Sequence, residues 1–286
     1  MNGVNMQIYL DCLPCMTRQV LEASRMSTDN EMLQGSIMEE AIGVLSGYKS
    51  FKNAPEICRE MHNIVKEQTG VIDPYSEIKQ RDLQTALSLY PKLKQSVQNK
   101  QDRLYWVLKA AATGNVIDSA VSCGYDIEKS IESELGRPFA VCDIAQFGRQ
   151  LEKAKSILVI GDNTGETVFD CLLLEELSDF DLTYAVRSAP ILNDATIGDA
   201  QASGIGQYAK IISTGCDVPG VLIDQCDEAF MDIFYGADIV ISKGQGNYES
   251  LSNCDRDIYF LLKAKCPVLS GLLGVGLNEY VFKYKG

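Results

Sequence analysis

The sequence predicts an α/β protein in which a helical amino-terminal region packs on a three-layer α/β/α domain with a mostly parallel sheet. From about residue 16 to residue 151, apolar residues recur every three or four positions, which is the period of helices. After residue 151, short apolar runs alternate with helix-like segments, as in parallel sheets whose strands are buried on both faces. We therefore expect a mainly helical region over residues 1–151 and a Rossmann-like α/β domain over residues 152–286.

Helix boundaries in the first part follow from proline and glycine. Asp73 and Pro74 predict an N-cap followed by proline at the first helical position, and Pro91 is expected to end or kink that helix. A further helix over residues 102–112 is expected to exit at Gly114.

The strands of the second part are predicted from its apolar runs. They are expected at residues 156–160, 182–186, 209–214, 237–242 and 266–270. Pro267 is tolerable there because it stands at the start of its strand. The run at residues 280–285 is expected to add an antiparallel edge strand.

Composition and charge exclude several classes of protein. The 286 residues carry a net charge of −13, which argues against nucleic acid or an anionic membrane as partner. The first residues lack a basic start followed by an apolar run, and no stretch approaches about 18 uninterrupted apolar residues. We expect a cytoplasmic protein whose ten cysteines are mostly reduced.

Ligands of open α/β sheets bind beyond the carboxyl ends of the strands, and polar side chains follow several predicted strands here. Asp162 and Asn163 follow the first, and Asp194 comes after the second. Their oxygens suit Mg²⁺ or Mn²⁺, whereas the sole histidine, His62, is expected to be a surface or packed residue. The simpler alternative for Asp162 and Asn163 is a turn with a helix N-cap.

The fourth predicted strand runs into "SKGQGNYES", residues 242–250. Lys243 can grip a phosphoryl group, and glycines such as Gly244 let backbone N–H groups approach it. An ordinary glycine-rich connection is the alternative. A divalent cation between the acidic loops and a phosphate held by Lys243 would stabilise both, so metal-assisted phosphoryl hydrolysis is the simplest reaction for these residues.

Five segments resemble the metal-dependent damage-control phosphatase family, also called domain of unknown function 89. They are "DCLPC" at 11–15, "GNVID" at 114–118, "GDNTGE" at 161–166, "LNDAT" at 192–196 and "SKGQGNYE" at 242–249. The resemblance runs over nearly the whole chain, and its Cys-x-x-Cys places the chain nearest the stand-alone microbial members.

The resemblance implies a divalent metal held by Asp162, Asn163 and Asp194, and contact between Lys243 and the substrate phosphate. The metal would be Mg²⁺, Mn²⁺, Co²⁺ or Ni²⁺. The implied reaction is hydrolysis of phosphate esters of small phosphometabolites. These are damaged or surplus sugar phosphates, nucleotides or cofactor precursors.

Four further residues are candidates for the substrate pocket, each with a simpler alternative. Asn115 and Asp118 match the helical-region motif of the family, or form a helix C-cap and the next helix start. Glu166 stands behind the metal ligands, or is a favourable charge in a first helical turn. Arg187 adds a phosphate contact, or forms a surface salt bridge.

Cys12 and Cys15 precede a helical segment, and helix N-termini favour thiolates. Structural packing or a local disulfide, redox regulation, and metal binding with distant ligands such as Cys266 all remain open. The alternative to a phosphatase is a non-catalytic or redox-regulated metabolite- or nucleotide-binding protein on the same fold, and a weaker alternative is a nucleotide-dependent transferase.

Overall fold

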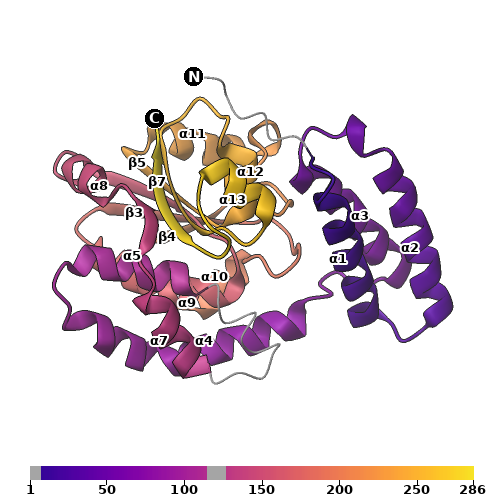
Figure 1. The fold of residues 1–286 in the computed structure, drawn as a ribbon, viewed down its shortest axis with the longest axis horizontal. Coiled ribbons are helices and arrows are strands. Elements are labelled where there is room, and N and C mark those ends of the chain that lie inside the picture. Colours follow the sequence, from indigo (N-terminus) through magenta and orange to yellow (C-terminus); the bar gives the residue numbers. More distant parts are fainter. Residues whose placement is uncertain (1–7, 115–126) are drawn as a thin grey trace.

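A mixed sheet lies at the centre of the computed structural model, which describes residues 8–114 and 127–286 (Figure 1). Within these residues the sheet has seven strands in the order β1-β7-β6-β5-β2-β3-β4. The strands are β1 Phe139–Cys142, β2 Ser156–Ile160, β3 Asp181–Val186, β4 Lys210–Ser213, β5 Ile239–Lys243, β6 Ile258–Lys263 and β7 Tyr280–Lys285. All neighbours pair in parallel except β6 and β7, so the sheet is mostly parallel, as predicted.

Helices cover both faces of the sheet, which confirms the three-layer prediction. One face carries α4 Ser76–Gln98, α5 Arg103–Thr113, α7 Ile127–Gly136, α8 Ile144–Leu151, α9 Thr164–Glu176 and α10 Ile197–Ala202. The other carries α11 Glu228–Gly236, α12 Gln245–Leu251 and α13 Pro267–Leu273. Strand β2 shows why: Ile157 and Val159 enter the first core, and Leu158 and Ile160 enter the second.

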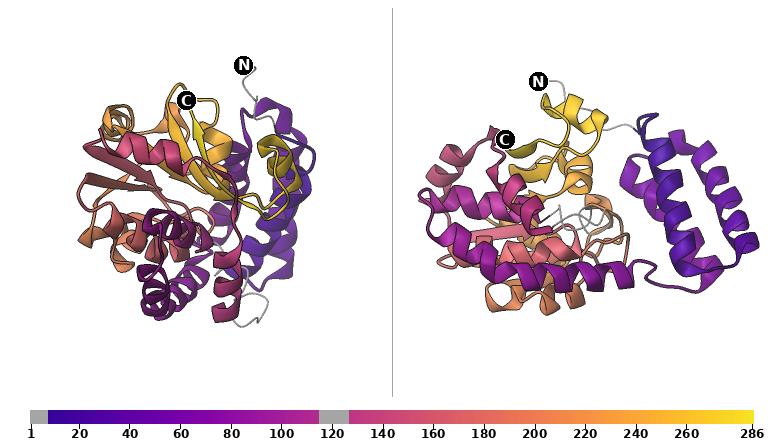
Figure 2. Two further views of the ribbon diagram at one scale, coloured as in Figure 1. Left: turned by 60° about the vertical axis from the view of Figure 1, so that its left-hand side comes forward. Right: turned by 60° about the horizontal axis from the view of Figure 1, so that its bottom comes forward.

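The first three helices form a separate bundle beside the α/β layers, and α4 runs towards it (Figures 1 and 2). They are α1 Cys12–Ser27, α2 Glu31–Ser46 and α3 Ala54–Thr69, and they share a core of their own. The bundle meets the sheet through the loop after β3, because Leu192 packs on the bundle core and Lys66 Nζ donates to the Pro190 carbonyl at 2.6 Å.

The predicted strand at residues 266–270 is wrong, because these residues begin helix α13. Pro267 stands in the first helical turn, where its missing N–H costs no hydrogen bond. The side chain of Cys266 accepts from the Leu269 N–H at the N-cap. The sheet contains β6 instead, an apolar run that the alternating pattern places among the helix-like segments.

The last strand is antiparallel to β6 as predicted, but it is not the edge strand. β1 lies outside it and pairs in parallel with β7. This strand was not expected, because it lies among residues assigned to helices. The predicted boundary between the helical region and the α/β domain, after residue 151, falls between α8 and β2.

Helix α4 begins and ends differently from the prediction. It starts at Ser76, because Asp73 Oδ1 accepts from the Tyr75 N–H in a turn that precedes the helix. It also continues through Pro91, which the helix accommodates on an exposed side. In the described ranges, no helix has the length and apolar character that a membrane span requires.

The fold can be tested at Phe169, which is fully buried in α9. Replacing Phe169 with Ala leaves a cavity, so we expect the free energy of unfolding in urea to fall by about 3–5 kcal/mol. The control is Ile72→Ala, since Ile72 is 73% exposed. The control should change stability by less than about 0.5 kcal/mol. Equal effects of the two substitutions would contradict this packing.

Candidate active site

The candidate site lies where the chain reverses its direction of travel across the sheet. From β2 the chain moves to β3 and β4 on one side, and later from β5 to β6 on the other. Since β2 and β5 are adjacent and parallel, the loops at their carboxyl ends lie together, and such switch points hold ligands in open α/β sheets. The loops that carry Asp162 and Gly244 therefore meet here.

Gly244 is required where it stands, because the carboxylate of Asp162 occupies the place of a side chain. A Cβ at Gly244 would lie 2.0 Å from Asp162 Oδ2, and the backbone there has a φ of +82°. Both features select glycine. The loop after β5 thus forms one wall against which Asp162 is held.

A second contact brings the Asp194 loop to the same point. The Thr164 N–H donates to the Asn193 carbonyl at 2.9 Å, and the Ala195 N–H donates to the Asp162 carbonyl at 2.8 Å. Leu192, just before them, has a φ of +47°, a strained conformation for a bulky residue. The structure therefore brings together the three residues predicted to bind metal: Asp162, Asn163 and Asp194.

The side chain of Asn163 is oriented by its amide nitrogen. Nδ2 donates to Glu166 Oε1 at 2.8 Å and to Asp162 Oδ2 at 3.3 Å. Asn163 occupies the N-cap position of α9, but its side chain makes no cap hydrogen bond. The amide oxygen is thus left to act as a ligand, and the simple N-cap alternative does not describe this residue.

Burial and mutual repulsion act on the two carboxylates. Burial, followed by the charges of Glu166 and Asp194, raises the pKa of Asp162 well above its ordinary value. Burial also raises the pKa of Asp194, although Arg187 opposes the shift. Arg187 offsets only part of the shift, so a cation among the oxygens of Asp162 and Asp194 would stabilise their ionised forms.

The donor set fits a hard divalent cation. Two carboxylates and one amide oxygen leave positions for water and substrate, an arrangement that Mg²⁺ prefers. Within residues 8–114 and 127–286, at this site as well as elsewhere, no three His, Cys, Asp or Glu side chains are placed to hold a metal ion. A metal ion bound by Asp162 and Asp194 would therefore need the amide oxygen of Asn163 as a third protein ligand.

Arg187 contacts Asp194 inside the protein. Its Nε donates to Asp194 Oδ2 at 2.7 Å, and both side chains are buried. The pair is not the surface salt bridge considered from the sequence. Nη1 and Nη2 of Arg187 are buried and have no hydrogen-bond partner within the described residues. A buried guanidinium group rarely leaves its donors unused, so these atoms suit an anion beside the metal ligands.

Lys243 is fully buried and already lies between two carboxylates. Its Nζ is 3.0 Å from Glu166 Oε2 and 2.5 Å from Asp170 Oδ1. Burial alone would lower the pKa of Lys243, but Asp170 and Glu166 raise it above its ordinary value, so the ammonium stays charged. Burial raises the pKa of Asp170 to about 6 against the pull of Lys243.

Asp170 and its partner Tyr184 were missed by the sequence reading. The Tyr184 hydroxyl donates to Asp170 Oδ2 at 2.6 Å. The Tyr184 ring passes under Gly161, where a Cβ would lie 2.6 Å from the hydroxyl oxygen. The available signal was a lone acid in the apolar run "TVFDCLLL", four residues after Glu166 and so on the same helix face.

The chain matches a known protein family over most of its length. Residues 8–281 match the family model described as "Damage-control phosphatase ARMT1-like domain". The chain belongs to this family. The family predicted from five sequence motifs is therefore confirmed.

Archaeal relatives match over nearly their full lengths. An uncharacterised protein of Methanocaldococcus jannaschii is 34% identical, covering 98% of this chain and 96% of the relative. A damage-control phosphatase of Pyrococcus horikoshii is 32% identical, covering 94% of this chain and 95% of the relative. The crystal structure of a DUF89 family protein from Pyrococcus horikoshii superimposes with a TM-score of 0.90 at 32% identity, covering 98% of this chain and 100% of that chain.

One family motif is only partly described. Gly114 packs on the first turn of α9, where a Cβ would lie 3.0 Å from the Glu166 Cα. The substrate contacts predicted for Asn115 and Asp118 lie outside the described residues. They stay predictions.

Cys12 and Cys15 are free thiols in the first turn of α1, and Cys15 is exposed. Burial raises the pKa of Cys12, and burial also raises the pKa of Cys15, with Cys266 and Glu249 adding to both shifts. Burial thus opposes the thiolate form that a helix N-terminus favours, and packing, redox regulation and metal binding stay alternative predictions for Cys12 and Cys15. His62 is a packed residue of α3, and its side chain is only 2% exposed.

The close fit of Gly244 against Asp162 allows a test of whether Asp162 binds the metal ion. In Gly244→Ala, the added methyl group must displace the Asp162 carboxylate, so we expect the affinity for Mn²⁺ to fall by roughly 10- to 100-fold with the fold retained. Calorimetric titration with Mn²⁺ measures this.

The matched control is Gly198→Ala in helix α10, because a Cβ at Gly198 meets no atom within 4 Å. Its Mn²⁺ affinity should equal that of the unchanged protein. Unaltered affinity in Gly244→Ala, with circular dichroism unchanged, would show that Asp162 is not a metal ligand.

Proposed function

We propose that this chain is a metal-dependent phosphatase that hydrolyses phosphate esters of small phosphometabolites. One observation carries the proposal: the buried Nη1 and Nη2 atoms of Arg187, which have no hydrogen-bond partner among the described residues, lie next to Asp194, which shares its loop contact with Asp162 and Asn163. Anion donors and cation ligands thus stand side by side. The family, and the relatives named damage-control phosphatases, support the same activity.

The oxygens of Asp162, Asn163 and Asp194 would hold the divalent cation, which we expect to be Mg²⁺, Mn²⁺, Co²⁺ or Ni²⁺. When bound, such an ion polarises phosphoryl oxygens and lowers the pKa of water. Glu166 fixes the amide of Asn163, and Lys243 fixes Glu166. These two contacts explain why the buried Lys243 lies directly behind the loop that carries Asp162 and Asn163.

The substrate phosphate would be held by donors from two strands. Arg187 offers the N–H groups of Nη1 and Nη2 in a fixed planar geometry. Lys243 has three N–H donors, and Glu166 and Asp170 take two of them, so the third remains for a phosphate oxygen. The backbone at Gly244 has no side chain to keep the substrate away. Lys243 therefore binds phosphate as well as ordering the carboxylates.

The substrate is a small molecule and not a nucleic acid. The net charge of −13 repels a polyanion, whereas a single phosphate is drawn in locally by Arg187, Lys243 and the bound cation. Sugar phosphates, nucleotides and cofactor precursors are the substrates to screen.

Asp162 gives the direct test of the reaction. In Asp162→Ala the cation loses a ligand, so we expect hydrolysis of p-nitrophenyl phosphate in the presence of Mn²⁺ to fall more than about 100-fold. The control is Asp232→Ala, which removes an exposed carboxylate of α11 and should leave turnover unchanged. Full metal-dependent turnover in folded Asp162→Ala would refute the assignment.

Arg187 separates phosphate binding from metal binding. Arg187→Lys keeps a positive charge beside Asp194 but removes the planar fork, so the inhibition constant of inorganic phosphate should rise about tenfold or more. The Mn²⁺ concentration for half-maximal activity should stay within about twofold. The control is Arg25→Lys in the exposed last turn of α1. Equal losses of phosphate and metal affinity would contradict the proposed role of Arg187.

A further inference from the structure

Two thiols in the loop between β4 and α11 lie against each other. Cys216 and Cys226 pack in one small cluster with Val218 and Leu222. Cys216 is buried, and Cys226 is partly buried. The proposed phosphatase reaction uses neither of them. Two thiols in contact can form a disulfide where the backbone holds both in place.

The backbone closes this loop directly beside the two cysteines. The Asp227 N–H donates to the Thr214 carbonyl at 3.1 Å. Gly215 has a φ of +77°, and a Cβ there would lie 2.4 Å from Asp227 Cγ. Gly215 precedes Cys216, and Asp227 follows Cys226. The two arms of the loop therefore approach each other closely at one side of the thiols.

A side chain of the helical bundle joins the same two arms at the other side of the thiols. Nη1 of Arg59 donates to Asp217 Oδ1 at 3.1 Å and to Gln225 Oε1 at 2.5 Å. Asp217 follows Cys216, and Gln225 precedes Cys226. Contacts on both sides thus hold the two arms together at the positions of the cysteines, as a disulfide requires.

Cys216 is surrounded by hydrogen-bond donors. The pKa of Cys216 is lowered to about 6, first by a hydrogen bond from Cys226 and then by the N–H groups of Leu222 and Val218. The charge of Arg187 adds to this shift, and burial opposes it. The thiolate is the form of cysteine that reacts with oxidants, and these donors favour it at neutral pH.

Cys226 keeps the proton of the pair. Its Sγ donates to the Leu222 carbonyl at 3.2 Å. The hydrogen bond to Cys216, burial and the charge of Cys216 all raise the pKa of Cys226. A thiolate beside a thiol is the combination that peroxides convert to a disulfide, because the first is oxidised and the second then displaces the added oxygen.

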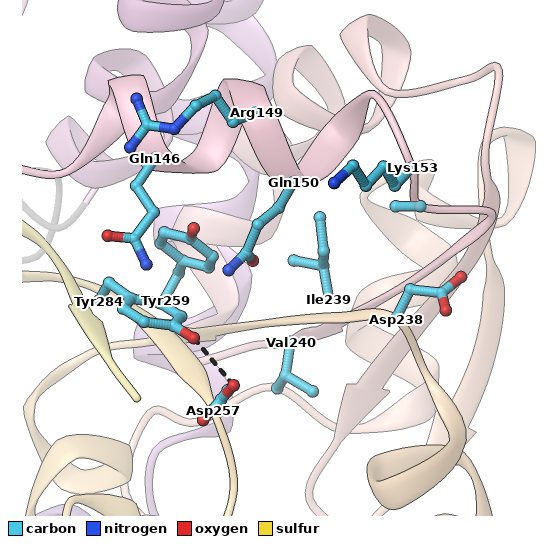
Figure 3. A pocket seen from close by; sticks show the side chains of 11 residues that line it. Gln146, Arg149, Gln150, Lys153, Asp238, Ile239, Val240, Asp257, Tyr259 and Tyr284 are labelled. Carbon is cyan, nitrogen blue, oxygen red and sulfur yellow. Dashed lines mark hydrogen bonds between the residues drawn. The ribbon is translucent and has the colours of Figure 1, made fainter.

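A cavity elsewhere in the molecule lacks such a group. It has a volume of about 580 Å³ and is lined by α8, by the starts of β5 and β6, and by the end of β7 (Figure 3). Arg149 and Lys153 line it together with Asp238 and Asp257, so both signs of charge are present. None of its lining residues is a cysteine. The thiol pair is therefore the stronger candidate for a reactive site.

We propose that Cys216 and Cys226 form a peroxide-sensitive site that closes to a disulfide. Hydrogen peroxide is scarcely larger than water, and it reaches the pair from the partly exposed side of Cys226. The disulfide joins the two arms from which Asp217 and Gln225 hold Arg59 of the bundle. The site needs no metal and does not depend on the proposed phosphatase function.

The reaction has two steps. The Cys216 thiolate attacks one oxygen of hydrogen peroxide, the O–O bond breaks, and hydroxide leaves, so the sulfur becomes a sulfenic acid. The Cys226 sulfur then attacks the Cys216 sulfur, the S–O bond breaks, and water leaves with the Cys226 proton. One thiolate, one thiol and one peroxide thus give a disulfide, hydroxide and water, and two electrons pass from sulfur to oxygen.

Peptide mapping after peroxide treatment tests the site. The reduced full-length protein, with chelator present, is exposed to a small excess of hydrogen peroxide at pH 7, denatured, alkylated and digested with trypsin. Cys216 and Cys226 are the only cysteines of the tryptic peptide 211–243. We expect this peptide to lose two hydrogens and to escape alkylation, and dithiothreitol to reverse both changes.

The rate distinguishes this pair from ordinary thiols. Cys142 and Cys254 are also partly buried, and burial raises the pKa of each. The disulfide should form at least about tenfold faster than either of these thiols is lost, because only Cys216 is held as a thiolate. Oxidation of Cys142 and Cys254 while peptide 211–243 remains fully alkylated would overturn the proposal.

Single substitutions test the order of the two steps. In Cys226→Ser the sulfenic acid has no thiol to meet, so Cys216 should proceed to a sulfinic acid that dithiothreitol does not reverse. In Cys216→Ser the thiolate is lost, so Cys226 should remain open to alkylation. The control, Cys142→Ser, should form the disulfide at the unchanged rate. Equal oxidation of Cys226 with and without Cys216 would contradict the pairing.

Discussion

Backbone hydrogen bonds between residues 162–164 and residues 193–195 hold two buried carboxylates close together at the carboxyl edge of the sheet. Neither carboxylate would stay ionised there without positive charge nearby, and burial raises the pKa of both. The surrounding residues can be understood as responses to this constraint. Arg187 donates to Asp194 and offsets part of its charge. The amide nitrogen of Asn163 donates to Glu166, which leaves the amide oxygen available as a ligand. Gly244 has no side chain and so leaves space for the carboxylate of Asp162.

Lys243 shows how the same constraint extends into the core. A lysine this deeply buried requires partners, and it finds them in Glu166 and Asp170 on one face of α9. Tyr184 holds the far oxygen of Asp170, and Gly161 makes room for the Tyr184 ring. A continuous network therefore connects the loop after β2 with the loop after β5, and it sets the position of Asn163 through Glu166.

The sequence predicts the parts of this arrangement that depend on strand order and residue type. Asp162, Asn163, Asp194 and Lys243 each follow a buried apolar run, and parallel strands bring their carboxyl ends to one edge. The sequence does not predict that Lys243 has carboxylate partners, because Asp170 reaches it from a helix whose rotation is set by tertiary packing. For the same reason, the sequence could not show that Arg187 is buried with two nitrogens that have no hydrogen-bond partner in the described part of the chain.

Errors in the fold have a similar origin. Short apolar runs next to a proline suit a strand start or a helix start, and at Pro267 the N-cap from Cys266 decides for the helix. Strand β1 has only four residues, which local periodicity does not distinguish from the neighbouring helices, and its pairing with β7 defines it. In both places a partner distant in the sequence determines the local structure.

We propose that one divalent cation is held by Asp162, Asn163 and Asp194. Anomalous diffraction from crystals grown with Mn²⁺ would locate this cation. We expect a single strong peak within roughly 2.0–2.6 Å of both carboxylates and of the amide oxygen of Asn163. A peak elsewhere, such as beside Cys12 and Cys15, with none between Asp162 and Asp194, would contradict it.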